Sequence, residues 1–182
     1  PSSNIIGDSI SALGFPAGGS LGFDKVWKVS EEGYTHTLST CNCAFRKEIF
    51  NKLGSFDESF PYAGGEDTLF AAKISKAGIK IKYCPDVKVE HEPRTNLISF
   101  LQWQVMRGKC AFQFKKKVVA VNSFAKMRVW STKNVIMTFW NDKKIPLILL
   151  LILLSYVLQG IGFFIANINN LFGTRIFTDT CR

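Results

Sequence analysis

The stretch GGEDTLFAAKISKAGIKIKY, residues 64–83, decides how this chain folds and where its polar chemistry lies. Two glycines form a flexible turn directly before the adjacent carboxylates Glu66 and Asp67. Apolar residues spaced three and four apart predict a helix over residues 67–77, which Gly78 ends. Alternation of apolar and polar residues then predicts a half-buried strand over residues 79–83. We therefore expect two neighbouring acids where a glycine turn meets a helix.

The residues before this stretch predict a shorter helix and a glycine-rich N-terminal region. Apolar side chains share one face of a helix over residues 46–53, and Gly54 stands where that helix should end. Residues 1–38 are rich in Gly and Ser and are interpreted mainly as loop. Short strands are expected within that region, at residues 26–29 and 34–38.

The residues after it predict a turn, a strand and a long helix. Pro85 and Asp86 form the turn, and the strand covers residues 87–91. Alternation places His91 at the end of this strand, on its apolar and inward side. A helix is expected over residues 97–114, with a set of larger side chains along one face: Phe100, Trp103, Gln104 and Arg107.

The charges of the chain are unevenly distributed. Lys and Arg total 23 against 14 Asp and Glu, and basic residues gather between Arg107 and Lys144. They are followed by the uncharged run IPLILLLILLSYVLQGIGFFIA, residues 145–166. A bilayer core of ~30 Å needs about 20 apolar residues, so this run is long enough to span a membrane.

The apolar run favours a membrane-surface role for the basic stretch that precedes it. Because basic residues lie mainly on its N-terminal side, the positive-inside rule places that side in the cytoplasm. Residues 119–144 then form a juxtamembrane segment attracted to anionic headgroups, and residues 167–182 form a short tail. A basic nucleic-acid-binding surface and a buried helix of a soluble protein are alternatives that the apolar run disfavours. We expect a membrane partner and no nucleic acid.

The five cysteines carry no predicted chemistry. Cys41 and Cys43 are separated by a single residue, which does not match the ligand spacing of a zinc site. In a cytoplasmic compartment cysteines remain reduced, so we expect neither disulfides nor a cysteine metal site.

Residues 42–91 resemble the C-terminal half of family 2 glycosyltransferases, which have the GT-A fold. The order and spacing of several short pieces carry the resemblance, since each piece alone is weak. The resemblance implies an α/β fold class, with residues 1–118 as the C-terminal part of a catalytic domain and a transmembrane helix after it. The matching pieces are Asn42–Arg46, Leu53–Phe60, Gly64–Asp67, Lys76–Gly78 and 85–91.

The family resemblance also implies a reaction and roles for particular residues. Family members transfer a sugar from a nucleotide-diphosphate donor to an acceptor hydroxyl and invert the anomeric carbon. Asp67 corresponds to the general base, with Glu66 beside it orienting the acceptor or contacting the donor sugar. His91 corresponds to a residue that helps to hold a divalent cation, Mg²⁺ or Mn²⁺, or the donor diphosphate. Asn42 and Gly65, in the matching pieces, are candidate substrate-binding residues.

Processive members of the family carry the motif Gln-x-x-Arg-Trp on a helix at the membrane. Gln104 and Arg107 match this motif and are candidates for binding the donor diphosphate, but Gly108 replaces its tryptophan. That departure argues against processive polymer synthesis. Trp103 is a further candidate, for stacking on a sugar.

Each of these residues also has a purely structural interpretation. Asp67 could cap its helix, Glu66 could bind a backbone N–H of the glycine turn, and His91 could be a hydrogen-bonded core residue. Arg107 could meet a lipid phosphate, and Trp103 could be a packed aromatic side chain.

The last predictions concern the length of the whole protein and the acceptor of the sugar. The sequence does not begin with Met, so we expect a longer protein. The resemblance implies that the missing N-terminal half binds the nucleotide and carries an Asp-x-Asp metal motif, which these residues lack. The acceptor is expected to be a lipid-linked or cell-surface glycan, because anchoring would hold the site near such substrates. The alternative function is a non-catalytic membrane module that binds a glycan or a partner.

Overall fold

The computed structural model describes residues 4–14, 21–60, 62, 64–89, 94–117 and 121–172. For residues 121–125 it describes the backbone alone. Within these residues the structure is mainly helical, with one small sheet. The helices are α1 (Ile5–Ser11), α2 (Phe23–Val26), α3 (Lys47–Leu53), α4 (Glu66–Lys76), α5 (Leu97–Lys117), α6 (Val121–Phe139) and α7 (Ile145–Phe172). The strands are β1 (Tyr34–Thr35) and β2 (Ile81–Lys82).

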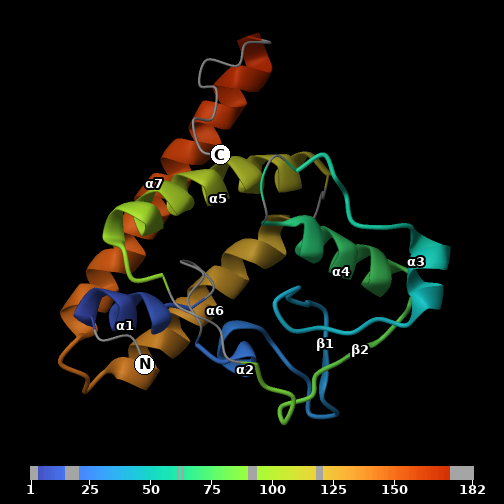
Figure 1. The fold of residues 1–182 in the computed structure, drawn as a ribbon, viewed down its shortest axis with the longest axis horizontal. Helices are drawn as coiled ribbons and strands as arrows, with labels where there is room; N and C mark the ends of the chain where they lie inside the picture. Colours follow the sequence, from blue (N-terminus) through green and yellow to red (C-terminus); the bar gives the residue numbers. More distant parts are fainter. Residues whose placement is uncertain are drawn as a thin grey trace.

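The elements form two groups around separate cores. The long helices α5, α6 and α7 pack with α1, while α3, α4 and the strands lie to one side of them (Figure 1). The first core lies among the long helices and contains Leu13, Phe100, Val135, Ile148 and Leu151. The second lies under α4 and contains Leu38, Phe70, Ala71 and Ile74, with the rings of Phe45, Phe50 and Phe56 packed against them.

Helix α4 confirms the helix that was predicted from residues 64–83. Gly64 and Gly65 adopt φ angles of 141° and 106°, in the region that favours glycine, and so let the chain turn into the helix. Leu69, Phe70 and Ile74 are buried along one face, and Gly78 follows the end of the helix with φ 72°. Helix α3 likewise confirms the helix predicted over residues 46–53 and is followed by Gly54.

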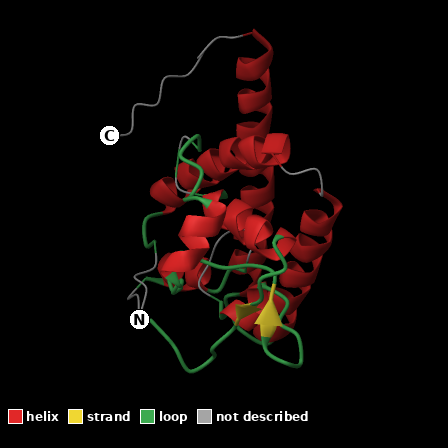
Figure 2. Ribbon diagram, turned by 90° about the vertical axis from the view of Figure 1, so that its right-hand side faces the viewer, coloured by secondary structure: helices red, strands yellow, loops and turns green. Residues whose placement is uncertain are grey.

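The sheet is smaller than the alternation of the sequence indicated. β1 and β2 pair antiparallel, with Tyr34 opposite Lys82 and Thr35 opposite Ile81. The predicted strand over residues 26–29 is wrong, because residues 23–26 form α2 and Val29 makes only an isolated bridge to Thr35. Figure 2 shows the two short strands beside the much larger helical part.

The predicted strand over residues 87–91 is wrong over its described part. Residues 87–89 form no strand, and Val87 and Val89 are 62% and 54% exposed. Alternation alone predicted a strand there, but a strand also needs a neighbour to accept its backbone hydrogen bonds. Instead, the side-chain amide of Asn42 donates to the carbonyl oxygen of Val87 at 3.0 Å. Glu90 and His91 lie outside the described residues.

The N-terminal region contains a helix that was not expected. Residues 1–38 were interpreted mainly as loop, yet α1 begins after Asn4, whose side-chain oxygen accepts the N–H of Ile6 at 2.9 Å. This capping bond satisfies an N–H that the first helical turn leaves free. Ile10 and, beyond the helix, Leu13 then enter the core shared with α7.

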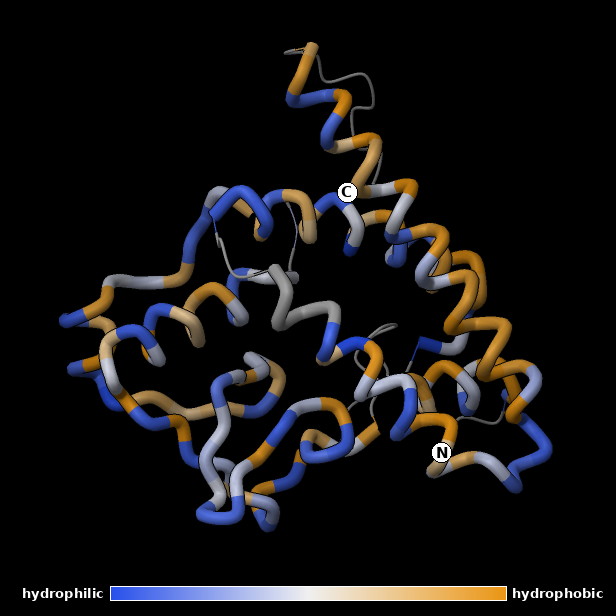
Figure 3. Tube along the Cα trace, turned by 180° about the vertical axis from the view of Figure 1, so that it is seen from behind, coloured by the Kyte–Doolittle hydropathy of each residue, from blue (hydrophilic) through white to orange (hydrophobic). Residues whose placement is uncertain are grey.

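Helix α7 extends past the predicted end of the apolar run, from Ile145 to Phe172. Within the described residues, it is a helix long and apolar enough to cross a membrane. One face is buried against the other helices, through Ile148, Leu151, Ile152, Ser155, Gln159 and Gly162. The opposite face is exposed and apolar, through Leu150, Leu153, Val157, Ile161 and Phe164; we call these five residues the outer stripe of α7. Figure 3 shows the hydrophobic character along most of the helix.

Candidate active site

Helix α4 contacts α5, and the glycine turn at the start of α4 lies near Cys110 of α5; this contact defines the candidate site. The glycine turn holds the two acids at the first helical positions, and Gly65 itself is the residue that precedes the helix. A Cβ at Gly65 would lie 3.0 Å from the ring of Phe60, so the turn also has little room for a side chain. The backbone therefore fixes the direction in which Glu66 and Asp67 leave the helix.

Glu66 binds the turn that precedes it. Its Oε2 accepts the N–H of Gly64 at 2.6 Å, as the structural interpretation of this residue predicted. The charge of Glu66 also raises the pKa of Cys110 on α5, after the larger effect of burial, so the acid and this part of α5 are near each other. Glu66 thus stabilises the glycine turn at the contact between α4 and α5.

Asp67 is a partly buried carboxylate with a raised pKa. Burial is the main cause of the increase, and the neighbouring charge of Glu66 adds to it. Hydrogen bonds oppose the increase, because Asp67 Oδ1 accepts the backbone N–H of Thr68 at 2.6 Å and the Thr68 hydroxyl at 3.2 Å. A carboxylate with a raised pKa accepts a proton more readily, which is the property that a general base requires.

The loop that carries Asn42 and Cys43 lies beside Asp67. Burial raises the pKa of Cys43, and the charge of Asp67 raises it further. Asn42 does not point freely into this site, since its amide donates to Val87. In the structure, Asn42 therefore ties the loop to the segment that follows β2.

Arg107 on α5 supplies a positive charge near Asp67. The pKa of Arg107 is lowered to about 10, mainly by burial and further by the charge of Arg128 on α6, while the charge of Asp67 acts in the opposite direction. Arg107 remains charged at neutral pH, with a carboxylate and a second guanidinium within electrostatic reach.

Trp103 contacts two arginines. The guanidinium carbon of Arg94 lies 4.5 Å from the centre of a Trp103 ring, and that of Arg107 lies 5.0 Å from it. Such contacts are cation–π interactions, which hold the guanidinium planes in place without neutralising their charge. Arg107, near Asp67, is therefore a cation held against an aromatic ring, and a guanidinium is a group that can pair with two oxygens of a phosphate.

Gln104 has a different environment from its neighbours on α5. It is fully buried, and its Oε1 accepts a hydrogen bond from Nε2 of Gln159 on α7 at 2.8 Å. Oε1 of Gln159 in turn accepts a hydrogen bond from Arg128 at 2.8 Å. From the sequence, Arg128 was expected only to belong to the basic stretch between Arg107 and Lys144. The chain Arg128–Gln159–Gln104 links α6, α7 and α5.

Asp57, upstream of the site, stabilises a loop. Its Oδ1 accepts the N–H of Ser59 at 3.0 Å and the hydroxyl of Ser59 at 2.6 Å, and the carboxylate pairs with Lys117 at the end of α5. The bond to Lys117 is the main reason that the pKa of Asp57 is well below its usual value. Asp57 thus fixes the turn in the way that Asp side chains commonly bind turn amides.

The predicted cation ligand His91 lies outside the described residues. Among the residues that the structure does describe, no group of three His, Cys, Asp or Glu side chains is placed to hold a metal ion. The described part of the site therefore offers one carboxylate pair and several arginines, but no assembled set of cation ligands.

Comparison with known proteins gives one partial similarity. Over 54 residues the chain is 39% identical to the O-antigen chain rhamnosyltransferase WbaN of Salmonella anatum. The matched segment covers 30% of this chain and 16% of the length of that relative. No protein-family model and no solved structure matches the chain.

Proposed function

We propose that this chain is part of a membrane-associated glycosyltransferase of the family 2 type, with the C-terminal portion of a GT-A domain. The partial similarity to a rhamnosyltransferase supports glycosyl transfer in general terms. The order of motifs in residues 42–91 supports the finer assignment. Since the chain spans 16% of that relative, the activity of the whole protein is part of the proposal.

A single observation carries the proposal. Asp67, a carboxylate with a raised pKa at the start of α4, lies within electrostatic reach of Arg107, which is held against Trp103. A base beside a cation suits displacement of an anionic leaving group by a hydroxyl. Such a reaction requires removal of one proton and stabilisation of the departing charge.

The proposed reaction uses these groups in the following way. Asp67 accepts the proton of the acceptor hydroxyl while the hydroxyl oxygen forms a bond to the anomeric carbon of the donor sugar. The bond between that carbon and the nucleoside diphosphate breaks, and its electron pair leaves with the diphosphate oxygen. Arg107 stabilises the charge on the diphosphate, and attack from the opposite side inverts the anomeric carbon. The described residues do not assemble a set of cation ligands, so no step is assigned to Mg²⁺ or Mn²⁺, and His91 remains a predicted ligand.

The proposal includes the location and the acceptor. The outer stripe of α7 contacts the membrane, the catalytic part lies on the cytoplasmic side, and the acceptor is a lipid-linked or cell-surface glycan. A membrane-bound acceptor would be held near the site by the contact of α7 with lipid.

The test is transfer by the full-length protein carrying Asp67→Asn. This variant should lose turnover while it still binds a nucleotide-diphosphate sugar, measured by calorimetry. Asp86→Asn, at an exposed acid in the turn after β2, is the matched control and should retain turnover. Normal turnover by Asp67→Asn would remove Asp67 from the mechanism. Donor binding without turnover in the unaltered full-length protein would instead favour a non-catalytic binding module.

A further inference from the structure

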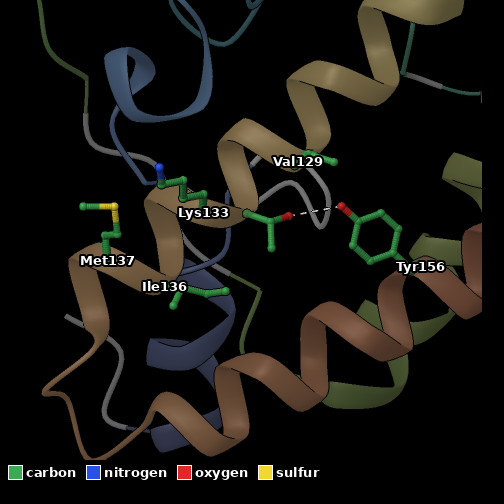
Figure 4. A pocket seen from close by; sticks show the side chains of 6 residues that line it. Val129, Lys133, Ile136, Met137 and Tyr156 are labelled. Carbon is green, nitrogen blue, oxygen red and sulfur yellow. Dashed lines mark hydrogen bonds between the residues drawn. The ribbon is translucent and has the colours of Figure 1, made fainter.

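An open groove lies between α6 and α7, away from the candidate active site. Its volume is about 350 Å³, within the range of ~300–1,000 Å³ that ligand pockets occupy. The lining residues are Val129, Thr132, Lys133, Ile136 and Met137 of α6 and Tyr156 of α7. Figure 4 shows Ile136 directed toward α7, with Lys133 and Met137 on the outer side of α6.

A hydrogen bond between side chains of α6 and α7 links the two walls of the groove. The Thr132 hydroxyl and the Tyr156 hydroxyl lie 3.1 Å apart and satisfy each other across the groove. With its main polar groups paired in this way, the groove offers a mostly apolar lining. Hydrocarbon is the chemistry that such a lining binds without leaving polar groups unsatisfied.

The groove is continuous with a larger apolar surface. On α6, Val129 and Met137 are 70% and 67% exposed, although both are apolar. On α7, Leu153 and Leu149 precede Tyr156 by three and seven residues, so they share its side of the helix and are also exposed. An exposed apolar surface of this extent on helices next to an apolar span is typical of a contact with lipid.

The charge of α6 indicates which lipid would fit. Residues 121–139 include Lys126, Arg128 and Lys133 and no acidic residue. Lys133 lines the groove and is exposed, so its ammonium group can reach a phosphate above the hydrocarbon. Basic residues at a membrane surface attract anionic headgroups.

We infer that the groove between α6 and α7 binds one acyl chain of an anionic phospholipid, with Lys133 contacting the phosphate. This inference rests on the proposed contact of α7 with the membrane and is independent of sugar transfer. Arg128, also on α6, is bonded to Gln159 and does not line the groove.

The test uses the full-length protein in vesicles that contain a lipid with a photoreactive diazirine on one acyl chain. The probe is phosphatidylglycerol in one set of vesicles and phosphatidylcholine in the other, at equal amounts. After illumination, mass spectrometry should find the label on the α6 residues that line the groove. Labelling should be roughly five-fold stronger for phosphatidylglycerol, the preference that one lysine near an anionic surface supplies.

Two variants with matched controls test the geometry. Ile136→Trp fills the groove and should reduce labelling of α6 several-fold, whereas Leu150→Trp, on the outer stripe of α7, should not. Lys133→Gln should remove the preference for phosphatidylglycerol, whereas Lys143→Gln, at an exposed lysine outside the groove, should retain it. Circular dichroism confirms that each variant is folded before it is compared.

Each result decides a part of the inference. Label on the outer stripe of α7 with none on α6 would overturn the groove as a binding site. Equal labelling by both lipids would overturn the contact of Lys133 with phosphate. Vesicle binding and sugar transfer are measured in parallel, so failure of the lipid site is distinguishable from failure of the proposed transferase activity.

Discussion

Gly108 on α5 and Gly162 on α7 bring the backbones of their two helices into contact. A Cβ at Gly108 would lie 2.1 Å from the carbonyl oxygen of Gln159, and a Cβ at Gly162 would lie 2.0 Å from that of Val105. No side chain fits at either position, and small residues are what allow helices to approach so closely. The crossing leaves no room at position 108 for a tryptophan such as the one in the motif Gln-x-x-Arg-Trp.

Replacement of Gly108 should therefore destabilise the protein. Gly108→Ala adds a methyl group that meets backbone atoms of α7, and overpacking of this kind costs about 1–3 kcal/mol of the free energy of unfolding. Gly160→Ala is the matched control, since nothing lies within 4 Å of a Cβ there. It should stabilise the helix by about 0.5–1 kcal/mol, because alanine favours helix over glycine. Thermal unfolding in detergent measures both, and equal effects of the two variants would contradict the close crossing.

The polar chain from Arg128 through Gln159 to Gln104 should couple the three long helices. Gln159→Leu removes one buried and one partly buried hydrogen bond and should cost about 1–3 kcal/mol of the free energy of unfolding. The double variant Gln104→Leu with Gln159→Leu should cost less than the sum of the single variants, because both partners of one bond are then apolar. Additive costs in this double-mutant cycle would show that the Gln104–Gln159 bond contributes nothing.

The raised pKa of Asp67 predicts that Asp67→Asn abolishes transfer without lowering the stability of the protein. The folded protein binds the Asp67 proton more tightly than the unfolded chain does, so this group lowers stability as pH rises through its raised pKa. Asp67→Asn removes that cost, and at neutral pH the variant should be no less stable than the unaltered protein while it loses transfer. A purely structural acid in the first helical turn would instead stabilise the helix by about 0.3–1 kcal/mol. Unfolding measured from pH 4 to pH 8 separates the two outcomes.

Transfer itself should fall at low pH. Only the deprotonated carboxylate accepts a proton, so the rate should decrease as pH drops through the pKa of Asp67, above the usual value of about 3.9 for aspartate. The pH profile of kcat/KM in the full-length enzyme measures this pKa. A rate that stays constant down to pH 4 would contradict a basic role for Asp67.

The guanidinium group of Arg107 should bind the donor diphosphate through its planar geometry as well as its charge. Arg107→Lys keeps a positive charge but loses the planar, two-pronged geometry that matches a phosphate. Hydrogen bonds to a charged group contribute about 1.5–3 kcal/mol, so the variant should lose roughly 10- to 100-fold in affinity for a nucleoside diphosphate. Lys116→Gln, on the same helix and bonded to Asn170, is the control that should leave affinity unchanged. Calorimetry with the full-length protein measures both.

The elements that the sequence predicted well are those with local signals. Helices α3 and α4 each end at a glycine with positive φ, and a glycine needs no information from distant residues to adopt it. Helix α5 was predicted from the spacing of Phe100, Trp103, Gln104 and Arg107, and the structure extends it to Lys117. In the candidate site, the places of Glu66 and Asp67 at the start of α4 followed from the same local pattern.

The features that could not be predicted depend on contacts distant in sequence. Residues 87–89 alternate as a strand does, but no neighbouring strand pairs with them, and only the fold reveals that. Hydropathy identified residues 145–166 as apolar and could not show that one face of α7 packs on the basic helix α5. The nearness of Arg107 to Asp67 likewise arises from packing of α5 on α4. Arg128 was missed for the same reason, because its partner Gln159 is 31 residues away.

The outer stripe of α7 should contact lipid, and an acidic substitution there tests it. Leu153 is 60% exposed on this stripe, and Val87, after β2, is 62% exposed on another part of the molecule. Leu153→Asp places a carboxylate where lipid is expected, at a cost of about 2.5–3.5 kcal/mol if the position lies deep in the bilayer. It should therefore weaken binding to vesicles by roughly 100-fold, whereas Val87→Asp should leave binding unchanged. Because both residues are exposed, neither variant should lose much stability, and co-sedimentation with vesicles reports only the contact with lipid. Equal binding by the two variants would mean that the outer stripe faces something other than the membrane.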